Sequence, residues 1–306
     1  MLDDSKLIWM DGKLIPWKDA TVHVLSHTLH YGNAVFEGTR AYKTEKGLAI
    51  FRLRDHTKRL LESAKITLIT PKYSLEELEQ AQIDVLKVNN YNKNVYIRPL
   101  IFLGYGKMGV SPKGAPRQVM VATWEWGSYL GDDGIENGIK VKISSFSRYS
   151  VKSTMGKAKA AANYLNSQMA NEEAVDAGYD EALLLDEEGF VAEGSGECFF
   201  IVKNGVLISP PNDYSLNSIT QDTTIQIANK LNIPLLRRKI TRDEVYTADE
   251  AFFTGTAAEI TPINNVDGRV IGNGKRGHMT EKLQKSYFDV VYGRDSSFEH
   301  FLTYVK

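Results

Sequence analysis

The sequence predicts a mixed α/β fold. Short β-rich runs are interleaved with helical stretches, and hairpin signals stand at Asp11-Gly12 and Asn204-Gly205. Strands and helices do not alternate strictly, which argues against a doubly wound parallel sheet. The chain has 306 residues, of which 42% are hydrophobic. That is enough for one large domain or two of ordinary size, with a sizeable core.

The N-terminal part opens with a predicted hairpin. Residues 7–10 and 13–16 are short β-rich runs, and Asp11-Gly12 between them favours a type I′ turn. Ser74 followed three residues later by Glu77 is a capping box and predicts the start of a helix. Two longer β-rich runs, residues 95–103 and 118–124, predict further strands.

Residues 55–66 predict an amphipathic helix. Asp55 is the expected N-cap, because its carboxylate can accept the free N–H groups of a first turn. Leu60, Leu61 and Ala64 recur on one face at helical spacing, so we expect that face to be buried.

Residues 127–138 are rich in Gly, Asp and Asn and predict a linker between two domains. We therefore expect a small domain over 1–126 and a large domain over 139–306. An alanine-rich helix is expected over 158–177, ending at Gly178. A helix over 220–231 is expected to have Thr220 as N-cap. Further strands are expected over 139–146, 181–185, 190–192, 197–202 and 251–254, and a late helix over 280–291.

Composition narrows the class of protein. The net charge is −1 and no long basic run occurs, so we expect neither nucleic acid nor an anionic membrane as a partner. No apolar run is long enough to span a bilayer, and residues 1–13 lack the apolar centre of a signal peptide. A single cysteine, Cys198, forms no internal disulfide. We expect a cytoplasmic protein.

Lys157 and Lys159 are candidates for chemistry. They stand beside an apolar, alanine-rich segment, where burial of an ammonium is costly and lowers the pKa of a lysine. An amine with a lowered pKa is a nucleophile toward carbonyl groups. From the residues alone the two lysines compete, and a solvated lysine is the ordinary alternative. Tyr164, five residues after Lys159, would lie about one and a half helical turns away.

An anion site is expected where Ile219 and Thr220 open a helix, because free N–H groups and the helix dipole attract anions there. The turn of Thr256 and Ala257 could supply further N–H groups, and Arg59 could add a bidentate contact. Each signal is weak by itself, since N-caps and helical arginines are common.

Glu193 lies next to Gly194, where a glycine permits close approach of the backbone to a ligand. A carboxylate beside a heterocyclic nitrogen would keep that nitrogen protonated. His23, His27 and His30 have a spacing that could suggest a metal site, but no thiolate is near, so we expect structural roles and no metal.

Together these segments resemble the branched-chain aminotransferases of the class IV, fold-type IV family, which depend on pyridoxal 5′-phosphate. The resemblance runs in order from about residue 7 to about residue 277. Its most specific parts are residues 31–38 (Tyr-Gly-Asn-Ala-Val-Phe-Glu-Gly), 159–164, 193–197, 218–220 and 255–262. It implies a two-domain fold like that of D-amino-acid aminotransferase, with a small N-terminal α/β domain and a larger C-terminal pseudo-barrel domain.

The resemblance also implies residue roles. Lys159 is identified with the lysine that carries the cofactor, Tyr164 with the partner of its phenolic oxygen, and Glu193 with the partner of its pyridine nitrogen. Arg59, Leu216, Ile219, Thr220 and Thr256 are identified with the phosphate site. The substrate residues it implies are Tyr31, Phe36, Gly38, Tyr96, Arg98, Met108, Val110, Trp126, Tyr129, Thr256 and Ala257.

Among these, Arg98 would bind the side-chain carboxylate of glutamate. Met108 and Val110 would reach the site of a neighbouring subunit, in a homodimer or higher homo-oligomer. Two positions depart from the family pattern. Asn217-Ser218 stands where Pro-Gly is usual, and Cys198 where asparagine is usual. The first changes the turn that aims the phosphate site.

The implied activity is reversible, ping-pong transfer of the amino group of leucine, isoleucine or valine to 2-oxoglutarate. A D-amino-acid or (R)-amine transaminase, or an aminodeoxychorismate-type lyase, would share the fold and cofactor. A non-catalytic binding protein on the same scaffold is the alternative from another class. Tyr96-Ile97-Arg98 favours the branched-chain L-amino acids.

Overall fold

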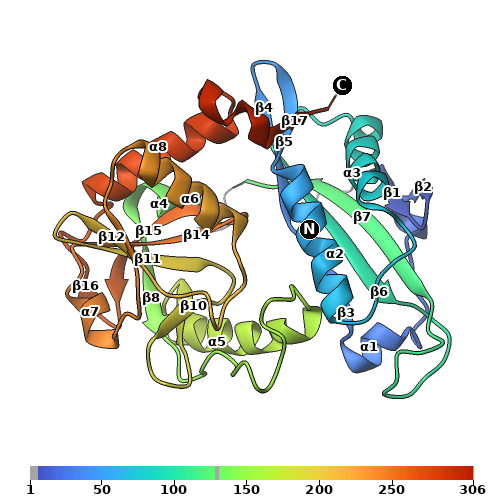
Figure 1. Ribbon diagram of the computed structural model, residues 1–306, viewed down its shortest axis with the longest axis horizontal. Coiled ribbons are helices and arrows are strands. Elements are labelled where there is room, and N and C mark those ends of the chain that lie inside the picture. Colours follow the sequence, from blue (N-terminus) through green and yellow to red (C-terminus); the bar gives the residue numbers. More distant parts are fainter. Residues whose placement is uncertain (1–5, 128–130, 306) are drawn as a thin grey trace. The chain divides into compact units, whose positions relative to one another are not determined.

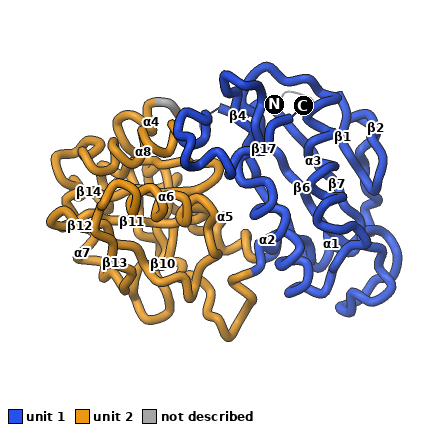
Figure 2. Tube along the Cα trace, turned by 45° about the horizontal axis from the view of Figure 1, so that its top comes forward, with its two compact units in different colours: residues 1–127, 158–162, 290–306 blue, residues 128–157, 163–289 orange. Residues whose placement is uncertain are grey.

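The computed structural model of the chain describes residues 6–127 and 131–305. These residues form two compact units, shown in different colours in Figure 2. Unit 1 comprises residues 1–127, 158–162 and 290–306, and unit 2 comprises 128–157 and 163–289. The domains expected from the sequence, residues 1–126 and 139–306, stay a prediction.

Unit 1 is built on an eight-stranded antiparallel sheet (Figure 1). Its strand order is β17-β5-β4-β6-β7-β1-β2, and β3 pairs with β6 beside this path. The strands are β1 (Leu7–Met10), β2 (Lys13–Pro16), β3 (Ala34–Phe36), β4 (Thr39–Thr44), β5 (Gly47–Phe51), β6 (Val95–Leu103), β7 (Arg117–Glu125) and β17 (Leu302–Tyr304). The helical elements are η1 (Trp17–Asp19), α1 (His27–Tyr31), α2 (Leu53–Ile66), α3 (Leu75–Asn89) and η3 (Ser296–Phe301).

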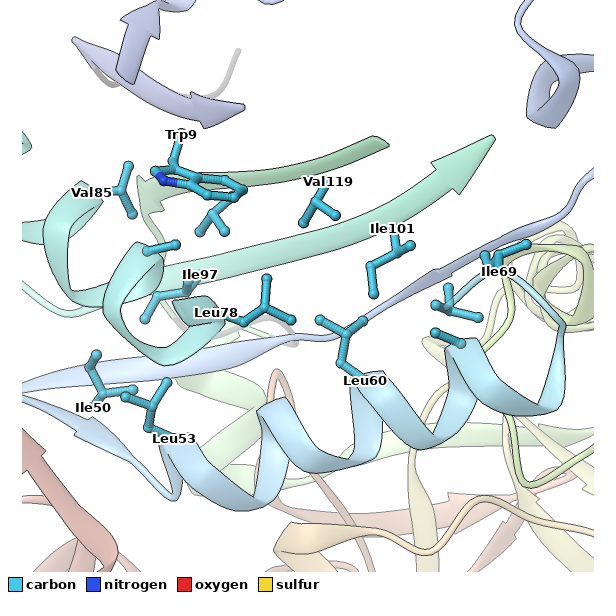
Figure 3. Close-up of a cluster of buried hydrophobic side chains, with 14 of the residues drawn as sticks. Trp9, Ile50, Leu53, Leu60, Ile69, Leu78, Val85, Ile97, Ile101 and Val119 are labelled. Atoms are coloured by element: carbon cyan, nitrogen blue, oxygen red, sulfur yellow. The ribbon is translucent and has the colours of Figure 1, made fainter. Parts of the chain in front are cut away.

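The core of unit 1 lies between this sheet and the helices α2 and α3. Figure 3 shows Leu60 of α2 pointing toward Ile97 and Ile101 of β6, with Leu78 of α3 beside them. Leu60, Ile97 and Ile101 are completely buried. Burial of a leucine or isoleucine contributes about 1.5–3 kcal/mol, so this cluster holds α2 and α3 on the sheet.

Unit 2 is built on a nine-stranded mixed sheet of order β10-β9-β8-β15-β14-β11-β12-β13, with β16 paired to β15. Three of its strand pairs are parallel: β12 with β13, β15 with β8, and β8 with β9. Its strands are β8 (Ile139–Ile143), β9 (Glu181–Leu185), β10 (Val191–Gly194), β11 (Cys198–Lys203), β12 (Val206–Ser209), β13 (Leu235–Arg237), β14 (Glu250–Gly255), β15 (Glu259–Val266) and β16 (Arg269–Val270). The remaining helical elements of the chain are α4 (Gly131–Asn137), η2 (Ala161–Asn163), α5 (Tyr164–Asp176), α6 (Ile219–Lys230), α7 (Arg242–Tyr246) and α8 (His278–Val291).

Local turn chemistry is confirmed. Asp11 and Gly12 have φ of 48° and 91°, and Asn204 and Gly205 have φ of 49° and 76°, the positive values that a type I′ turn requires. The capping box of Ser74 and Glu77 is present in both directions. The predominantly antiparallel sheets also confirm a mixed α/β architecture rather than a doubly wound one.

Three expectations about helix boundaries are wrong, and the expected linker region includes a helix. α2 begins two residues earlier than expected, and its N-cap is Arg52 and not Asp55. The Asp55 carboxylate forms an ion pair with the Arg52 side chain. The N-cap of α6 is Ser218 and not Thr220. The expected linker contains the helix α4. The expected helix over 158–177 begins only at residue 161, because the backbone before it pairs with β3.

Candidate active site

Lys159 lies in an extended segment of unit 1, and not on a helix. Its backbone N–H donates to Ser63 Oγ at 3.0 Å, and its carbonyl accepts from the N–H of Phe36 at 3.1 Å. The next residue, Ala160, forms a β-bridge with Val35. These bonds fix the backbone of Lys159 beside β3. Its Nζ then lies 5.1 Å from the centroid of the Phe36 ring, so the amine stands against an aromatic face.

A buried ionic cluster lies in the same unit. The Glu37 carboxylate is completely buried. It accepts from Arg59 Nε at 2.6 Å and from Arg59 Nη2 at 2.8 Å. His56 Nδ1 lies 2.8 Å from the second carboxylate oxygen. No role is expected for Glu37 or His56 from the sequence. Because the bidentate pair joins residues 22 positions apart, no local pattern marks it.

The pKa values of this cluster follow from burial and charge. Burial would raise the pKa of Glu37, but the Arg59 guanidinium and the hydrogen bonds from His56 and Arg59 hold it well below its ordinary value. Burial lowers the pKa of His56 and outweighs the opposing hydrogen bond to Glu37; the charges of Arg59 and Lys159 lower it further. Glu37 is therefore an anion beside a neutral His56, and it holds Arg59 in one orientation.

Arg98, on β6, lies among aromatic rings. Its guanidinium carbon is 4.7 Å from the centroid of Phe36, 5.3 Å from that of Tyr96 and 5.7 Å from that of Trp124. Among the described residues, no carboxylate forms an ion pair with it, and its buried Nε has no hydrogen-bond partner. A cation held by ring faces, with an unused donor, is suited to an anionic ligand.

Gly38 and Trp126 complete this part of unit 1. The Tyr96 and Trp126 rings meet edge to face, with centroids 4.7 Å apart. A Cβ added at Gly38 would overlap the Tyr96 hydroxyl, so only glycine leaves room for this tyrosine. Phe36, Gly38, Tyr96, Arg98 and Trp126 all belong to unit 1.

In unit 2, Glu193 on β10 forms a buried ion pair with Arg148. Arg148 Nη2 lies 2.6 Å from Glu193 Oε1, and the two side chains are 7% and 6% exposed. Arg148 Nη1 also donates to Ser167 Oγ at 3.0 Å. Burial opposes the charge on Arg148, but Glu193 holds the pKa of Arg148 above its ordinary value. Arg148 was missed from the sequence, because a single arginine in a loop carries no pattern.

Two tyrosines lie near this pair. The Arg148 guanidinium stacks 4.4 Å from the centroid of the Tyr149 ring. Burial raises the pKa of Tyr149 to about 12, so its hydroxyl is neutral at physiological pH. Tyr164 is the first residue of α5 and is close enough to Arg148 to affect the pKa of that arginine. Tyr164 and Glu193 are thus both near the same guanidinium.

The expected anion-binding residues of unit 2 lie on neighbouring elements. Ile219 and Thr220 open α6, where Ser218 Oγ accepts from the N–H of Gln221 at 3.1 Å. Leu216 lies in the loop before them. α6 packs against β14, and Thr256 and Ala257 form the turn that follows β14. The N-terminal end of α6 and the turn after β14 present main-chain N–H groups, which are suited to an anion.

β14 also connects this turn to Glu193. It pairs with β11, where Cys198 faces Thr254. The N–H of Gly194 donates to the carbonyl of Glu197 at 2.7 Å, and a Cβ added at Gly255 would lie 3.4 Å from Glu197 Cγ. The Glu193-Gly194 end of β10 and the turn of Thr256 after β14 therefore lie at the same end of the strands of unit 2.

Three other expected substrate residues lie on the surface of unit 1. Tyr31, Met108 and Val110 are exposed in unit 1, by 42%, 37% and 87% respectively. Tyr129 lies outside the described residues. Among the described residues, no group of three or more side chains is arranged to hold a metal ion.

The three histidines use ring nitrogens to bond the backbone. His27 Nε2 lies 2.7 Å from the carbonyl of Gly109, and His30 Nε2 lies 2.9 Å from that of Val24. His23 Nδ1 accepts from the N–H of Leu25 at 3.0 Å. These bonds are structural, and they connect α1 to the loops around it.

The chain is similar to known proteins over most of its length. The family described as Amino-transferase class IV matches residues 34–266. The branched-chain-amino-acid aminotransferase of Pseudomonas aeruginosa is 50% identical over 306 residues, covering 100% of this chain and 99% of that one. The enzyme of the same name from Escherichia coli K12 is 44% identical over 288 residues, covering 94% and 93%.

Solved structures agree. The branched-chain amino acid aminotransferase of T.th. with pyridoxamine 5′-phosphate has a TM-score of 0.96 at 47% identity, with 99% of each chain covered. The same enzyme complexed with N-(5′-phosphopyridoxyl)-L-glutamate has a TM-score of 0.95 at 47% identity, with 99% of each chain covered. The fold expected from the sequence is confirmed by these structures.

Proposed function

The chain belongs to the class IV aminotransferase family, and from that membership we propose that it is a pyridoxal-5′-phosphate-dependent transaminase. It transfers the amino group of branched-chain L-amino acids to 2-oxoglutarate, and the reaction is reversible. Relatives that are 44–50% identical over nearly their whole length carry the name branched-chain-amino-acid aminotransferase, which is the observation that carries the proposal.

The residues of the chain fit this cofactor chemically. Lys159 offers an amine to the cofactor aldehyde, and Glu193, paired with Arg148, offers a buried anion to the pyridine nitrogen. Arg59, held by Glu37, and the first N–H groups of α6 offer donors to a phosphate. Tyr164 offers a hydroxyl to the phenolic oxygen, and Leu216 and Thr256 line the phosphate. When bound, pyridoxal 5′-phosphate supplies the aldehyde that takes up the amino group and a ring that withdraws electrons from the α-carbon.

The residues of the chain then supply binding and proton transfer. We assign to Lys159 the removal of the proton from the substrate α-carbon and its delivery to the cofactor C4′ atom. Glu193 holds the proton on the pyridine nitrogen. Because the Arg148 guanidinium forms an ion pair with Glu193, the Glu193 carboxylate stays ionised beside the protonated nitrogen.

Arg98 is assigned to the side-chain carboxylate of glutamate and 2-oxoglutarate. Its buried, unused Nε and the ring faces around it support this role. Phe36, Tyr31, Tyr96, Trp126 and Tyr129 are assigned to the apolar walls for branched side chains. Gly38 leaves room for the Tyr96 hydroxyl in such a wall. Thr256 and Ala257 offer N–H groups to the α-carboxylate.

We also propose a homodimer or higher homo-oligomer whose sites include residues of a second copy. In unit 1, large apolar side chains are exposed around α1, among them Val24 at 73%, Leu29 at 63% and Val110 at 87%. Beside them is an apolar cavity of about 240 Å³ lined by residues such as Met10, Val22, Leu29, Leu100, Phe102 and Met120. An apolar surface of this kind is suited to another protein chain. Met108 and Val110 would then reach the partner's substrate.

A cytoplasmic location is part of the proposal. The single cysteine, Cys198, is a buried free thiol, which is consistent with a reducing compartment. Over the described residues, no helix has the length and apolar character needed to cross a bilayer.

The visible absorption spectrum of the purified protein tests the function. With pyridoxal 5′-phosphate bound to Lys159 the protein should be yellow, and L-leucine added without an acceptor should bleach the band. Bleaching by D-alanine or an (R)-amine alone would contradict the substrate class. The variant K159A should lose multiple-turnover transamination, whereas K152A, which changes an exposed lysine nearby, should keep it.

A further inference from the structure

Lys157, the lysine that the cofactor role does not use, lies at the centre of a small network in unit 2. Its ammonium donates to the carbonyl oxygens of Asn212 and Ser215, the latter at 3.0 Å, and to Asn217 Oδ1 at 3.1 Å. An ammonium has three hydrogens, so these three acceptors satisfy it completely. No carboxylate forms an ion pair with Lys157 among the described residues.

All three acceptors belong to one loop, residues 210–218, which joins β12 to α6. Two of them are main-chain carbonyls that converge on one point. Converging carbonyl dipoles repel one another unless a cation lies between them, and here the ammonium is that cation. The conformation of this loop therefore depends on Lys157.

The same loop is also bound to the first turn of α6. Asn212 Nδ2 donates to Gln221 Oε1 at 2.9 Å, and Ser218 Oγ accepts from the N–H of Gln221 at 3.1 Å. Gln221 is 2% exposed, so it offers a fixed attachment. Lys157 thus holds a loop that is also bonded to Gln221 in the first turn of α6.

The hydrogen bonds of Lys157 and Ser218 restrict the backbone of this loop. A proline would restrict the backbone of this loop by itself, but Asn217 and Ser218 do not. In this chain the side chain of Asn217 accepts from Lys157 instead, and Ser218 caps the helix. A side-chain network supplies the restriction that a proline ring would otherwise supply.

We propose that Lys157 is a positioning residue for the cofactor phosphate. By holding the loop through Asn212, Ser215 and Asn217, it sets the direction of the N–H groups of Ile219 and Thr220. Those groups are the ones assigned to the phosphate, so the inference rests on the proposed function. Lys157 itself touches neither substrate nor cofactor in this assignment.

The test compares two probes that differ only by the phosphate. The full-length protein and its variants are titrated with pyridoxal 5′-phosphate and with pyridoxal, and binding is followed by the visible absorption band. K157A should weaken binding of pyridoxal 5′-phosphate about tenfold, which corresponds to about 1.4 kcal/mol, and leave pyridoxal binding unchanged. K152A, the matched control on an exposed lysine, should change neither.

A second variant keeps the test informative if K157A is unstable. N217A removes one of the three acceptors and should weaken pyridoxal 5′-phosphate binding about threefold, again without an effect on pyridoxal. The double variant should lose about tenfold and not about thirtyfold, because both changes remove the same bond.

Three results would overturn the inference. In the first, K157A and N217A bind pyridoxal 5′-phosphate as tightly as the wild type does. In the second, a variant loses affinity for pyridoxal 5′-phosphate and for pyridoxal by the same factor. In the third, the losses of the two single variants multiply in the double variant. If the wild-type protein binds neither probe, the proposed function falls. If the wild-type protein binds both probes and only the variants behave otherwise than expected, the positioning role of Lys157 is wrong and the proposed function stands.

Discussion

The guanidinium of Arg148 lies 2.6 Å from the carboxylate of Glu193, and both side chains are more than nine-tenths buried. Removing one partner of such a pair leaves an uncompensated buried charge, which costs about 3–5 kcal/mol. R148M should therefore lower the free energy of unfolding by about that amount and lower kcat with L-leucine. Urea denaturation and steady-state kinetics measure the two effects.

An exposed pair provides the contrast. Arg54 and Glu76 also form an ion pair, but their side chains are 64% and 68% exposed. R54A should lower the free energy of unfolding far less than R148M does, because solvent screens the exposed guanidinium of Arg54 in its pairs with Glu76 and Glu79. If R148M costs no more than R54A, the buried pair does not have the importance assigned to it.

Acidification should destabilise the protein through His56 and Glu37. The pKa of His56 is lowered on folding, so the unfolded chain binds a proton that the folded protein does not bind. Stability should fall as the pH drops through the ordinary histidine range near about 6.5, by up to about 1.4 kcal/mol per pH unit. The pKa of Glu37 is also lowered, so its contribution is present at neutral pH and lost below the ordinary glutamate range.

Thermal or urea unfolding between pH 7.5 and 5 checks this dependence. H56Q cannot take up the proton and should flatten the slope, whereas H300Q, which changes an exposed histidine, should leave it as in the wild type. An H56Q protein with an unchanged slope would show that His56 is not the titrating group.

Arg98 should distinguish the two kinds of substrate. It is assigned to the second carboxylate of glutamate, which leucine lacks, and a charge-assisted hydrogen bond is worth about 1.5–3 kcal/mol. R98M should raise the KM for 2-oxoglutarate by about 10- to 100-fold and change the half-reaction with L-leucine by less than about threefold. Stopped-flow measurement of each half-reaction provides the comparison. Equal losses on both substrates would assign Arg98 to a general role instead.

Gly38 should tolerate no side chain. A Cβ there would overlap the Tyr96 hydroxyl, so G38A must displace Tyr96 and the rings packed on it. One unaccommodated methyl group costs about 1–3 kcal/mol, so kcat/KM for L-leucine should fall about 10- to 100-fold. Gly127 has open space for a Cβ, and G127A should retain wild-type kinetics. Wild-type kinetics in G38A would mean that Tyr96 does not form the substrate wall.

Several elements of the fold were predictable because they depend on neighbouring residues. The Asn204-Gly205 turn, the Ser74 cap and the strand at 95–103 agree with the structure. Helix starts were less predictable where two residues could act as cap. Ser218 and Thr220 are both good N-caps; in the structure Ser218 is the cap, and its Oγ accepts from the N–H of Gln221.

The environment of Lys159 was not predictable in this way. Alanine-rich sequence favours a helix, yet the backbone around Lys159 bonds to Phe36 and Ser63, which are distant in sequence. Tertiary pairing thus outweighed helix propensity, which differs by less than about 1 kcal/mol between most residues.

By itself the sequence determined the architecture class, the ordered motifs and the family. It did so because turns, caps and apolar periodicity act over a few residues, and because a family is recognised from the order of its motifs. Tertiary structure alone decided the partners of the charged groups: Glu37 with Arg59 and His56, Arg148 with Glu193, and Lys157 with the loop before α6. A buried charge is stable only beside its partner, and that partner comes from wherever the folded chain brings one.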